Sequence, residues 1–405
     1  MIAGAVIVVT PHSVVRIAGL SVLQRMVFAL ERAGIQSIAL VVDGHGDGPH
    51  GALETRRPDT RLCRITPSEA PAFPDGEILV LSRALVIDAA WVTAVAELER
   101  PDAPVVVIDS PDPEAGSGAT GAYLAACPSG AEIRRLWAGG PDSSVADTVA
   151  PECPRVTLAT GVCRRVTPEA ETALLRSLRK KTDGFFAYYF DRRLSTAISR
   201  RLVRTGITPN QISVFTLLPA LAAAGLIAQA DPLTSGMGAL LYWASTILDG
   251  CDGEVARLKY LESAKGARLD LLCDNIGLVA LFTGLVIHVY SRSPGTALLY
   301  AGAAIIGGML AAMIIEYRLI ARPRIRVGGD QVPPCAAEQR RRELYERLAS
   351  RDFAYLLPPL AFTGTLSWFV WATAIGVNVF WIVLLVWVVR KRRSSLSATT
   401  SVGYP

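Results

Sequence analysis

The segment Asp249-Gly-Cys-Asp252-Gly-Glu-Val-Ala-Arg257 is followed, eight residues later, by Gly266, Asp270 and Asp274. It lies between stretches apolar enough to cross a membrane, where carboxylates are costly and usually face a polar cavity. Asp249 and Asp252 are spaced i,i+3, and Asp270 and Asp274 are spaced i,i+4, so each pair projects from one helix face. Two such helices side by side would converge four oxygen ligands on a divalent cation such as Mg²⁺ or Mn²⁺. Because the usual partner of such a metal is a phosphate group, the sequence predicts phosphate chemistry at a membrane boundary.

The pattern Asp-x2-Asp-Gly-x2-Ala-Arg-x8-Gly-x3-Asp-x3-Asp resembles the signature of the CDP-alcohol phosphotransferases, and every position of it is present. The resemblance covers about residues 180–393. It implies transfer of a substituted phosphate group from a CDP-linked donor to an acceptor alcohol, with CMP leaving, in phospholipid or inositol-phosphate synthesis. It also implies that Asp249, Asp252 and Asp270 hold metal, with two Mg²⁺ or Mn²⁺ ions in all. Asp274 completes a second metal site, removes the acceptor hydroxyl proton, or both, so Asp270 and Asp274 are the predicted catalytic residues.

A nucleotide site is predicted beside the carboxylates. The small residues that would let a nucleotide approach the backbone are Gly253, Ala256 and Gly266. Arg257 either contacts the donor or pairs with Glu254, three residues earlier on the same helix face. Asn210 follows Pro209, which suits the first turn of a helix, and a Pro-Asn pair before the first span is usual in the resembled family. Asn210 therefore either contacts the nucleotide or caps and orients the helix.

The composition indicates a membrane protein with a soluble part. The 405 residues are 51% hydrophobic and only 19% charged, with a net charge of +5 that is unevenly placed. The length suggests two or three domains. Seven scattered cysteines form no CxxC pair, which is typical of reduced thiols in a cytosolic context. No cleavable signal sequence and no nucleic-acid partner are expected.

Six apolar segments of near-spanning length follow residue 210. They are Gln211–Ala230, Gly236–Leu248, Leu271–Tyr290, Ala297–Tyr317, Phe353–Val370 and Ala372–Val389. A spanning helix needs about 20 apolar residues, so residues 208–393 are predicted to form an all-α six-helix transmembrane bundle. The second segment is short by that rule and is expected to continue through Asp249 and Asp252 as one long helix.

Positive charge is concentrated in one set of loops. That set contains Arg257, Lys259, Arg268, Arg324, Arg340 and their basic neighbours, and the tail adds Arg390 to Arg393, whereas the opposite set has only Arg292. By the positive-inside rule, the N- and C-termini, the tail at residues 394–405 and the carboxylate cluster are predicted to be cytosolic. The protein is therefore predicted to be integral to a lipid bilayer.

Residues 161–207 are predicted to form a linker and an amphipathic helix that lies on the cytosolic leaflet. Aromatic and apolar residues alternate there with the basic residues Arg192, Arg193, Arg200, Arg201 and Arg204. A linker helix that packs on the bundle is the alternative, and the two are compatible. Basic residues that face the cavity are candidates for binding a phosphate on the acceptor, although the positive-inside bias alone would also place them there. These candidates are Lys180, Lys181, Arg318 and Arg322.

Residues 1–160 alternate strand and helix signals. Short β-rich runs occur at Ala5–Thr10, Ser37–Val42, Ile78–Leu81 and Val105–Asp109. Between the first two, Gly19 to Gly34 has apolar residues at helical spacing, with Gly34 placed to end the helix. A strand, a helix and a parallel strand predict an α/β layer fold in a cytosolic domain.

The stretch Gly19 to Gly34 also resembles the helix of sugar-phosphate nucleotidyltransferases, a likeness that covers about residues 1–150. That family carries a Gly-rich loop after the first strand to cradle a triphosphate, but this chain has Thr10-Pro-His-Ser-Val-Val-Arg16 there. The family's metal-binding aspartate is also missing from Leu79–Ala84. We therefore expect a degenerate domain kept for folding, dimer contacts or substrate delivery. The two domains together resemble the bifunctional inositol-phosphate cytidylyltransferase and di-inositol-phosphate-phosphate synthase family.

Two other classes of function are compatible with parts of the pattern. One is a catalytically silent, membrane-anchored nucleotide-binding protein, and the other is a cation transporter. A transporter needs charged residues in mid-membrane or broken helices, whereas these carboxylates sit at one edge. The resemblance further implies a homodimer, and Gly302, Gly307 and Gly308 offer small surfaces for helix contact within or between bundles. The donor, CDP-diacylglycerol or a CDP-polyol, and the acceptor alcohol are left open.

Overall fold

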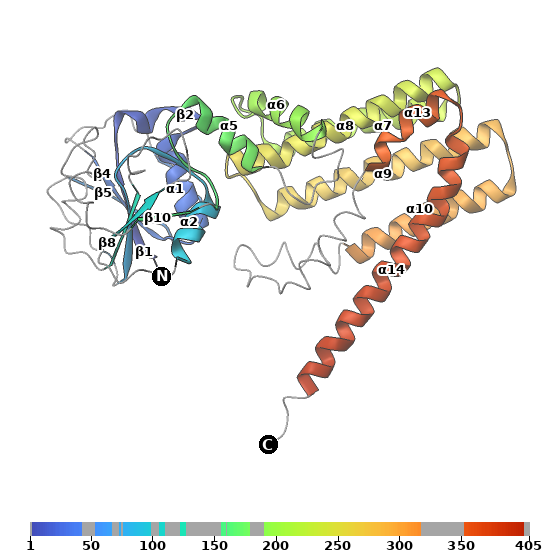
Figure 1. Cartoon of the computed structure of the whole chain (residues 1–405). Coiled ribbons are helices and arrows are strands. Elements are labelled where there is room, and N and C mark those ends of the chain that lie inside the picture. Colours follow the sequence, from blue (N-terminus) through green and yellow to red (C-terminus); the bar gives the residue numbers. More distant parts are fainter. Residues whose placement is uncertain are drawn as a thin grey trace. The chain divides into compact units, whose positions relative to one another are not determined.

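The chain divides into two compact units, Met1–Arg179 and Lys180–Pro405, in a computed structural model. The structure describes residues 2–42, 53–66, 73, 76–98, 105–109, 122–126, 155–158, 160–178, 190–316 and 352–400. Unit 1 is an α/β region and unit 2 is helical (Figure 1).

Unit 1 is built on a seven-stranded sheet with the order β10-β8-β9-β6-β1-β4-β5. Its elements are β1 (Ile2–Val8), η1 (Pro11–Val14), β2 (Arg16–Ile17), β3 (Leu20–Ser21), α1 (Val22–Arg32), β4 (Ser37–Val41), β5 (Arg61–Ile65), β6 (Glu77–Leu81), β7 (Leu85–Ile87), α2 (Ala89–Ala96), β8 (Val105–Asp109), β9 (Ala122–Ala126), β10 (Arg155–Thr157), β11 (Cys163–Arg165) and α5 (Pro168–Ser177). β1 pairs in parallel with β4 and β6, whereas β9 runs antiparallel to β6 and β8. The predicted α/β layer is therefore confirmed.

The helix predicted between Gly19 and Gly34 is α1. The Ser21 side chain caps it by accepting the Gln24 amide at 3.2 Å, which satisfies one of the unpaired donors at a helix start. Gly34 has a φ of 92°, the left-handed conformation expected of a glycine that ends a helix. The buried Arg25 guanidinium donates to the carbonyl oxygens of Ile17 and Ala18 at 3.0 and 3.2 Å, so this charge stabilises the β2–β3 turn.

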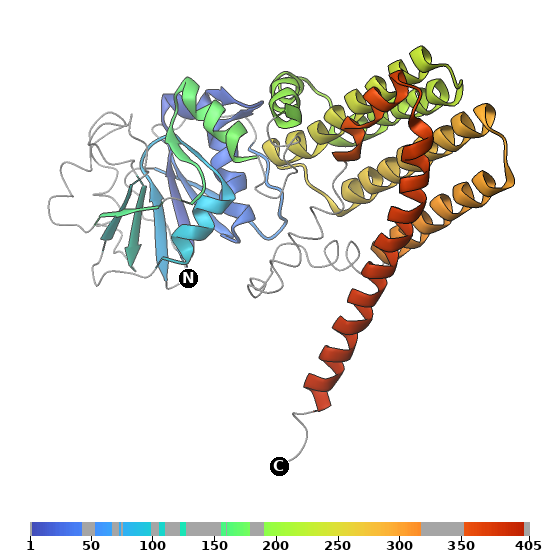
Figure 2. The same ribbon diagram turned by 45° about the vertical axis from the view of Figure 1, so that its right-hand side comes forward.

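Unit 2 contains long helices arranged side by side (Figures 1 and 2). Its elements are α6 (Arg192–Leu202), α7 (Pro209–Ala228), α8 (Pro232–Leu258), α9 (Ala264–Arg292), α10 (Thr296–Glu316), η4 (Asp352–Tyr355), α13 (Leu357–Phe362) and α14 (Leu366–Thr400). Four of these helices have stretches long and apolar enough to cross a membrane. Those stretches are Pro209–Ala228, Ala264–Arg292, Thr296–Ile315 and Leu366–Val383. The short segment at Gly236–Leu248 does continue through Asp249 and Asp252, as predicted, in the single helix α8.

The prediction of one spanning helix at Phe353–Val370 is wrong. That stretch consists of the 3₁₀ turn η4, the six-residue helix α13 and the beginning of α14. Gly364, with a φ of 70°, lies between α13 and α14 in a conformation that a continuing helix does not use. The stretch still runs beside α8, since Tyr355 lies against Trp243 and the Phe362 ring lies against Gly236.

Glycines allow α7, α8 and α9 to approach each other closely. A Cβ added at Gly238 of α8 would lie 2.8 Å from the Ala223 backbone oxygen, and one at Gly277 of α9 would lie 3.3 Å from the Ala220 Cβ. The buried side chains between these helices include Ala223, Tyr242 and Leu281. The close contact positions the polar ends of α8 and α9 next to the start of α7.

The Gly284→Ala variant should lose about 1–3 kcal/mol of stability, the usual cost of overpacking. A Cβ at Gly284 would lie 2.4 Å from the backbone oxygen of Ala224 in α7, an atom that cannot rotate away. The matched control is Gly225→Ala, because no atom of the described residues lies within 4 Å of a Cβ added there and helix propensity favours alanine by up to about 1 kcal/mol. Thermal unfolding in detergent measures both, and equal midpoints for the two variants would contradict this packing.

The glycines proposed for helix contact in α10 differ from each other. Added Cβ atoms at Gly302 and Gly308 would lie 2.8 Å from Val286 Cγ1 and 2.9 Å from Val377 Cγ1, so both residues pack inside the bundle. Gly307 has no described atom within 4 Å of such a position. Only Gly307 therefore keeps a small surface open for another helix.

Candidate functional site

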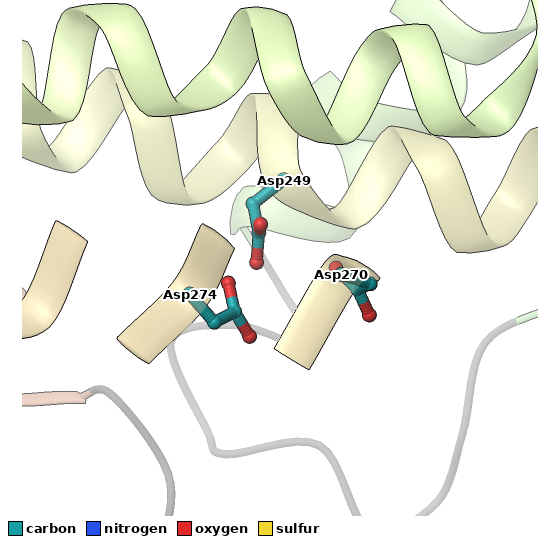
Figure 3. Close-up of side chains that lie close together, drawn as sticks. All are labelled: Asp249, Asp270 and Asp274. Carbon is teal, nitrogen blue, oxygen red and sulfur yellow. The ribbon is translucent and has the colours of Figure 1, made fainter. Parts of the chain in front are cut away.

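Three of the predicted carboxylates converge from two helices (Figure 3). Asp249 projects from α8, and Asp270 and Asp274 project from adjacent turns of α9. One carboxylate oxygen from each lies within 4.8 Å of the others, and all three side chains are half-buried. The spacing i,i+4 on α9 produces this arrangement because the two side chains lie one above the other on the same face.

The fourth carboxylate, Asp252, lies beside this group rather than in it. Its side chain is 6% exposed, accepts a hydrogen bond from the Ser213 hydroxyl of α7, and is close enough to Asp270 for the two carboxyl groups to interact. Three residues of α-helix rotate Asp252 by about 60° from Asp249. This rotation directs Asp252 toward α7 while Asp249 faces α9.

The carboxyl groups of Asp249, Asp270 and Asp274 fit a divalent-cation site. Carboxylates this close cannot all be ionised without a cation or a shared proton, because like charges repel strongly at short range. Hard oxygen ligands at such separations are those that Mg²⁺ and Mn²⁺ prefer. The part of the chain described between residues 190 and 316 forms no other acidic group of this kind.

A cavity of about 190 Å³ opens beside Asp252 and Asp270. It is lined by all five residues predicted to contact a nucleotide, Asn210, Gly253, Ala256, Arg257 and Gly266. The first turn of α7 is capped by the Thr208 hydroxyl, which accepts the Gln211 amide at 3.4 Å, and Pro209 is its first residue. Since Thr208 is the cap, the Asn210 side chain is left to line the cavity.

Arg257 lines the cavity and does not pair with Glu254. Glu254 pairs with Arg192 of α6 at 3.1 Å rather than with Arg257, and Arg257 lines the cavity instead. A Cβ at Gly253 would lie 3.5 Å from Arg257 Nη1, and one at Gly266 would lie 3.0 Å from Asn210 Oδ1. The two glycines therefore keep the cavity wall close to the backbone.

Glu254 forms a buried contact that the sequence did not reveal. Its side chain is fully buried, and Oε1 accepts hydrogen bonds from Arg192 at 3.1 Å and from the Ser195 hydroxyl at 2.7 Å. This contact attaches α6 to α8 two residues after Asp252, so α6 does pack on the bundle. No local signal could identify the partners, because they are 62 and 59 residues away from Glu254.

A second contact attaches the start of α6 to η4. The Tyr355 hydroxyl and the Trp243 indole both donate to the Asp191 carboxylate, the latter at 3.3 Å. Burial raises the pKa of Asp191, and these two hydrogen bonds oppose the rise. Trp243 belongs to α8 and Tyr355 is the last residue of η4, so the contact also holds η4 next to α8.

The acceptor-phosphate candidates fall outside the part of the chain that the structure describes. These are Lys180, Lys181, Arg318 and Arg322. Their role stays a prediction.

The chain was compared with known proteins. Residues 206–333 match the CDP-alcohol phosphatidyltransferase family. The chain is 40% identical over 114 residues to the bifunctional IPC transferase and DIPP synthase of Thermococcus kodakarensis, covering 27% of this chain and 25% of that protein. It is 31% identical over 134 residues to the protein of the same name from Archaeoglobus fulgidus, covering 33% and 25%. It thus spans about a quarter of the length of these curated relatives.

A solved structure of the Mycobacterium tuberculosis phosphatidylinositol phosphate synthase with CDP-DAG bound is 23% identical. The match covers 48% of this chain and 92% of that chain, with a TM-score of 0.34. The sequence match to the family includes the whole acidic motif from Asp249 to Asp274. Residues 206–333 of this chain are therefore a CDP-alcohol phosphatidyltransferase domain.

Proposed function

We propose that this chain is an integral membrane CDP-alcohol phosphotransferase. It moves a substituted phosphate group from a CDP-linked donor to an acceptor alcohol and releases CMP. The observation that carries the proposal is the convergence of Asp249, Asp270 and Asp274 beside the cavity that Asn210 and Arg257 line. A metal site next to a small, partly basic cavity suits a nucleoside diphosphate.

The residues around the cavity have different roles in this reaction. Arg257 and the small residues around it bind and orient the cytidine diphosphate. The acceptor oxygen forms a bond to the outer phosphorus of the donor, the bond from that phosphorus to CMP breaks, and CMP leaves with the bonding electron pair. Asp274 holds the proton that the acceptor hydroxyl loses. The four aspartates hold the metal, two ions of Mg²⁺ or Mn²⁺ in this proposal, which supplies charge neutralisation at the diphosphate.

A large apolar cavity supports a lipid as one substrate. It has a volume of about 630 Å³, lies between α9, α10 and α14, and is lined by Phe282, Met309, Phe369 and other apolar side chains. A third cavity, of about 20 Å³, is lined by Asp249 and Asp274 and is separate from the nucleotide cavity. Leu278 lines both this third cavity and the large apolar one. Acyl chains fit the apolar cavity with their head group at the aspartates, which favours CDP-diacylglycerol over a CDP-polyol as the donor.

The remaining parts of the proposal concern the setting of this domain. We propose that α8 crosses the bilayer with the four apolar helices, and that the aspartates and both termini face the cytosol, where most loop arginines lie. Unit 1 would be a degenerate nucleotidyltransferase-like domain, because η1 follows β1 where a phosphate-binding loop is needed. We also propose a homodimer, with Gly307 as the available small surface.

The test is CMP release by the purified full-length chain. CDP-diacylglycerol and CDP-inositol are each paired with inositol phosphate, glycerol phosphate and inositol, in Mg²⁺ or Mn²⁺. One donor–acceptor pair should release CMP, and EDTA should abolish that release because it removes the metal that would neutralise the charge of the diphosphate. Release with a CDP-polyol alone would contradict the lipid donor. CDP binding without CMP release in any pair would instead favour the silent nucleotide-binding protein.

A further inference from the structure

A second polar cavity lies at the other end of the helices. It has a volume of about 670 Å³ and is bordered by the beginnings of α8, α10 and α14 and by the last turns of α9. Its polar and aromatic lining includes His288, Arg292, Ser293, Thr363, Ser367 and Trp371. None of these residues belongs to the acidic motif or to the nucleotide cavity.

The distance between this cavity and the aspartates is about the thickness of a membrane core. Arg292 follows Asp274 by 18 residues in α9, and Pro232 precedes Asp249 by 17 residues in α8. At 1.5 Å per residue these separations are about 27 and 26 Å, and the hydrocarbon core of a bilayer is about 30 Å thick. With the aspartates at one surface of the bilayer, as proposed above, the cavity lies at the depth of the head groups of the opposite leaflet.

Arg292 is the cation of this cavity. Its side chain is exposed at the end of α9 and makes no hydrogen bond or ion pair with the residues that the structure describes. The nearby Asp231 carboxylate is engaged as the cap of α8, where it accepts the Thr234 amide at 3.0 Å. This hydrogen bond and, to a smaller extent, the charge of Arg292 lower the Asp231 pKa. The guanidinium donors thus remain available, and their planar fork suits a phosphate group.

His288 adds a hydrogen-bond acceptor. Its side chain is 1% exposed, and Nδ1 lies 2.9 Å from the carbonyl oxygen of Ile227. A carbonyl oxygen only accepts, so Nδ1 carries the hydrogen, and in the neutral ring Nε2 is then a hydrogen-bond acceptor. The cavity therefore combines a donor for phosphate with an acceptor for a hydroxyl or ammonium group.

Aromatic residues mark the same level of the bundle. Trp368 and Trp371, in the first turns of α14, are 77% and 45% exposed. Tryptophan is enriched where membrane-spanning helices meet the head groups, because its ring is apolar and its N–H is polar. Exposed tryptophans beside the cavity favour a lipid over a water-soluble molecule as its ligand.

We propose that this cavity binds the head group of a phospholipid from the leaflet opposite the acidic motif. Arg292 donates to the phosphodiester, and His288 accepts a hydrogen bond from a head-group hydroxyl or ammonium. The acyl chains lie along the apolar outer faces of α10 and α14, where Leu299 and Ile375 are exposed. This site rests on the bilayer crossing proposed above, but not on the phosphotransfer reaction.

The test is titration of the full-length chain in detergent with phosphatidylglycerol, followed by native mass spectrometry. The Arg292→Gln variant should weaken the tightest binding event about tenfold or more, the scale of one charge-assisted hydrogen bond. Ala297→Trp should also weaken it, because Ala297 is an exposed residue of the cavity wall that a large ring would fill. Arg61→Gln is the control, since it removes the same charge from the exposed edge of β5.

Two outcomes would overturn the proposal. One is phosphatidylglycerol binding by Arg292→Gln and Ala297→Trp with the affinity of the unmodified chain. The other is displacement of the bound lipid by millimolar inorganic phosphate, which would show a site for a free anion. Helical content by circular dichroism establishes that each variant is folded.

Discussion

The Asp270→Asn variant is expected to release CMP about 10³-fold more slowly, the scale on which one preorganised electrostatic group acts. Asp270 is one of the three carboxylates whose oxygens lie within 4.8 Å of one another, and it also neighbours Asp252. Asparagine keeps the shape of the side chain but removes an anionic ligand. Initial rates with the donor–acceptor pair that supports turnover, at saturating Mg²⁺ or Mn²⁺, measure the loss.

A second readout separates the loss of metal from loss of fold. Mn²⁺ should raise the melting temperature of the unmodified chain by mass action, because only the folded state holds the ligands together. Asp270→Asn should not show this shift. Its melting temperature without metal should equal or exceed that of the unmodified chain, because one repulsion between carboxylates is removed. The control is Asp231→Asn, which keeps the cap of α8 at the other end of the bundle. A Mn²⁺ shift in Asp270→Asn equal to that of the unmodified chain would show that the cluster is not the metal site.

The local geometry of the site could be predicted from the sequence because helical periodicity determines it. Asp270 and Asp274 share a face of α9, and the long α8 carries Asp249 opposite them, as their spacing indicated. The direction of the Asp252 side chain could not be predicted from the sequence. Its direction depends on α7, whose Ser213 is 39 residues away in the chain.

Other features could not be predicted from the sequence, for equally physical reasons. Hydropathy measures how apolar Phe353–Val370 is, but it does not detect the break between α13 and α14 at Gly364. The contact of Asp191 with Tyr355 joins residues 164 apart, and no spacing rule reaches so far. The polar residues of the cavity around Arg292 are likewise dispersed over α8, α9, α10 and α14, so only packing brings them together.

The second large effect concerns the buried pair of Arg192 and Glu254. The Arg192→Met variant should lose about 3–5 kcal/mol of stability, because removing one partner leaves an uncompensated buried charge. Glu254 is fully buried, and its Oε2 has no hydrogen-bond partner among the described residues. Among those residues, Arg192 is the only cation that forms a hydrogen bond with the Glu254 carboxylate. The Ser195 hydroxyl alone, at 2.7 Å, cannot neutralise the carboxylate.

Thermal unfolding of the purified chain in detergent measures this effect, with Arg193→Met as the matched control because Arg193 is the exposed neighbour on α6. The double variant Arg192→Met with Glu254→Leu should recover most of the lost stability, since replacing both partners with apolar side chains removes the buried charge. If the single variant reflected only the loss of α6 packing, the double variant would be at least as unstable.

Because Glu254 lies two residues from Asp252, CMP release by the double variant also tests whether the pair positions the motif or only stabilises it. If the double variant is as stable as the unmodified chain but releases CMP slowly, the pair of Arg192 and Glu254 positions the acidic motif. If its stability and its rate of CMP release both recover, the pair only stabilises the fold.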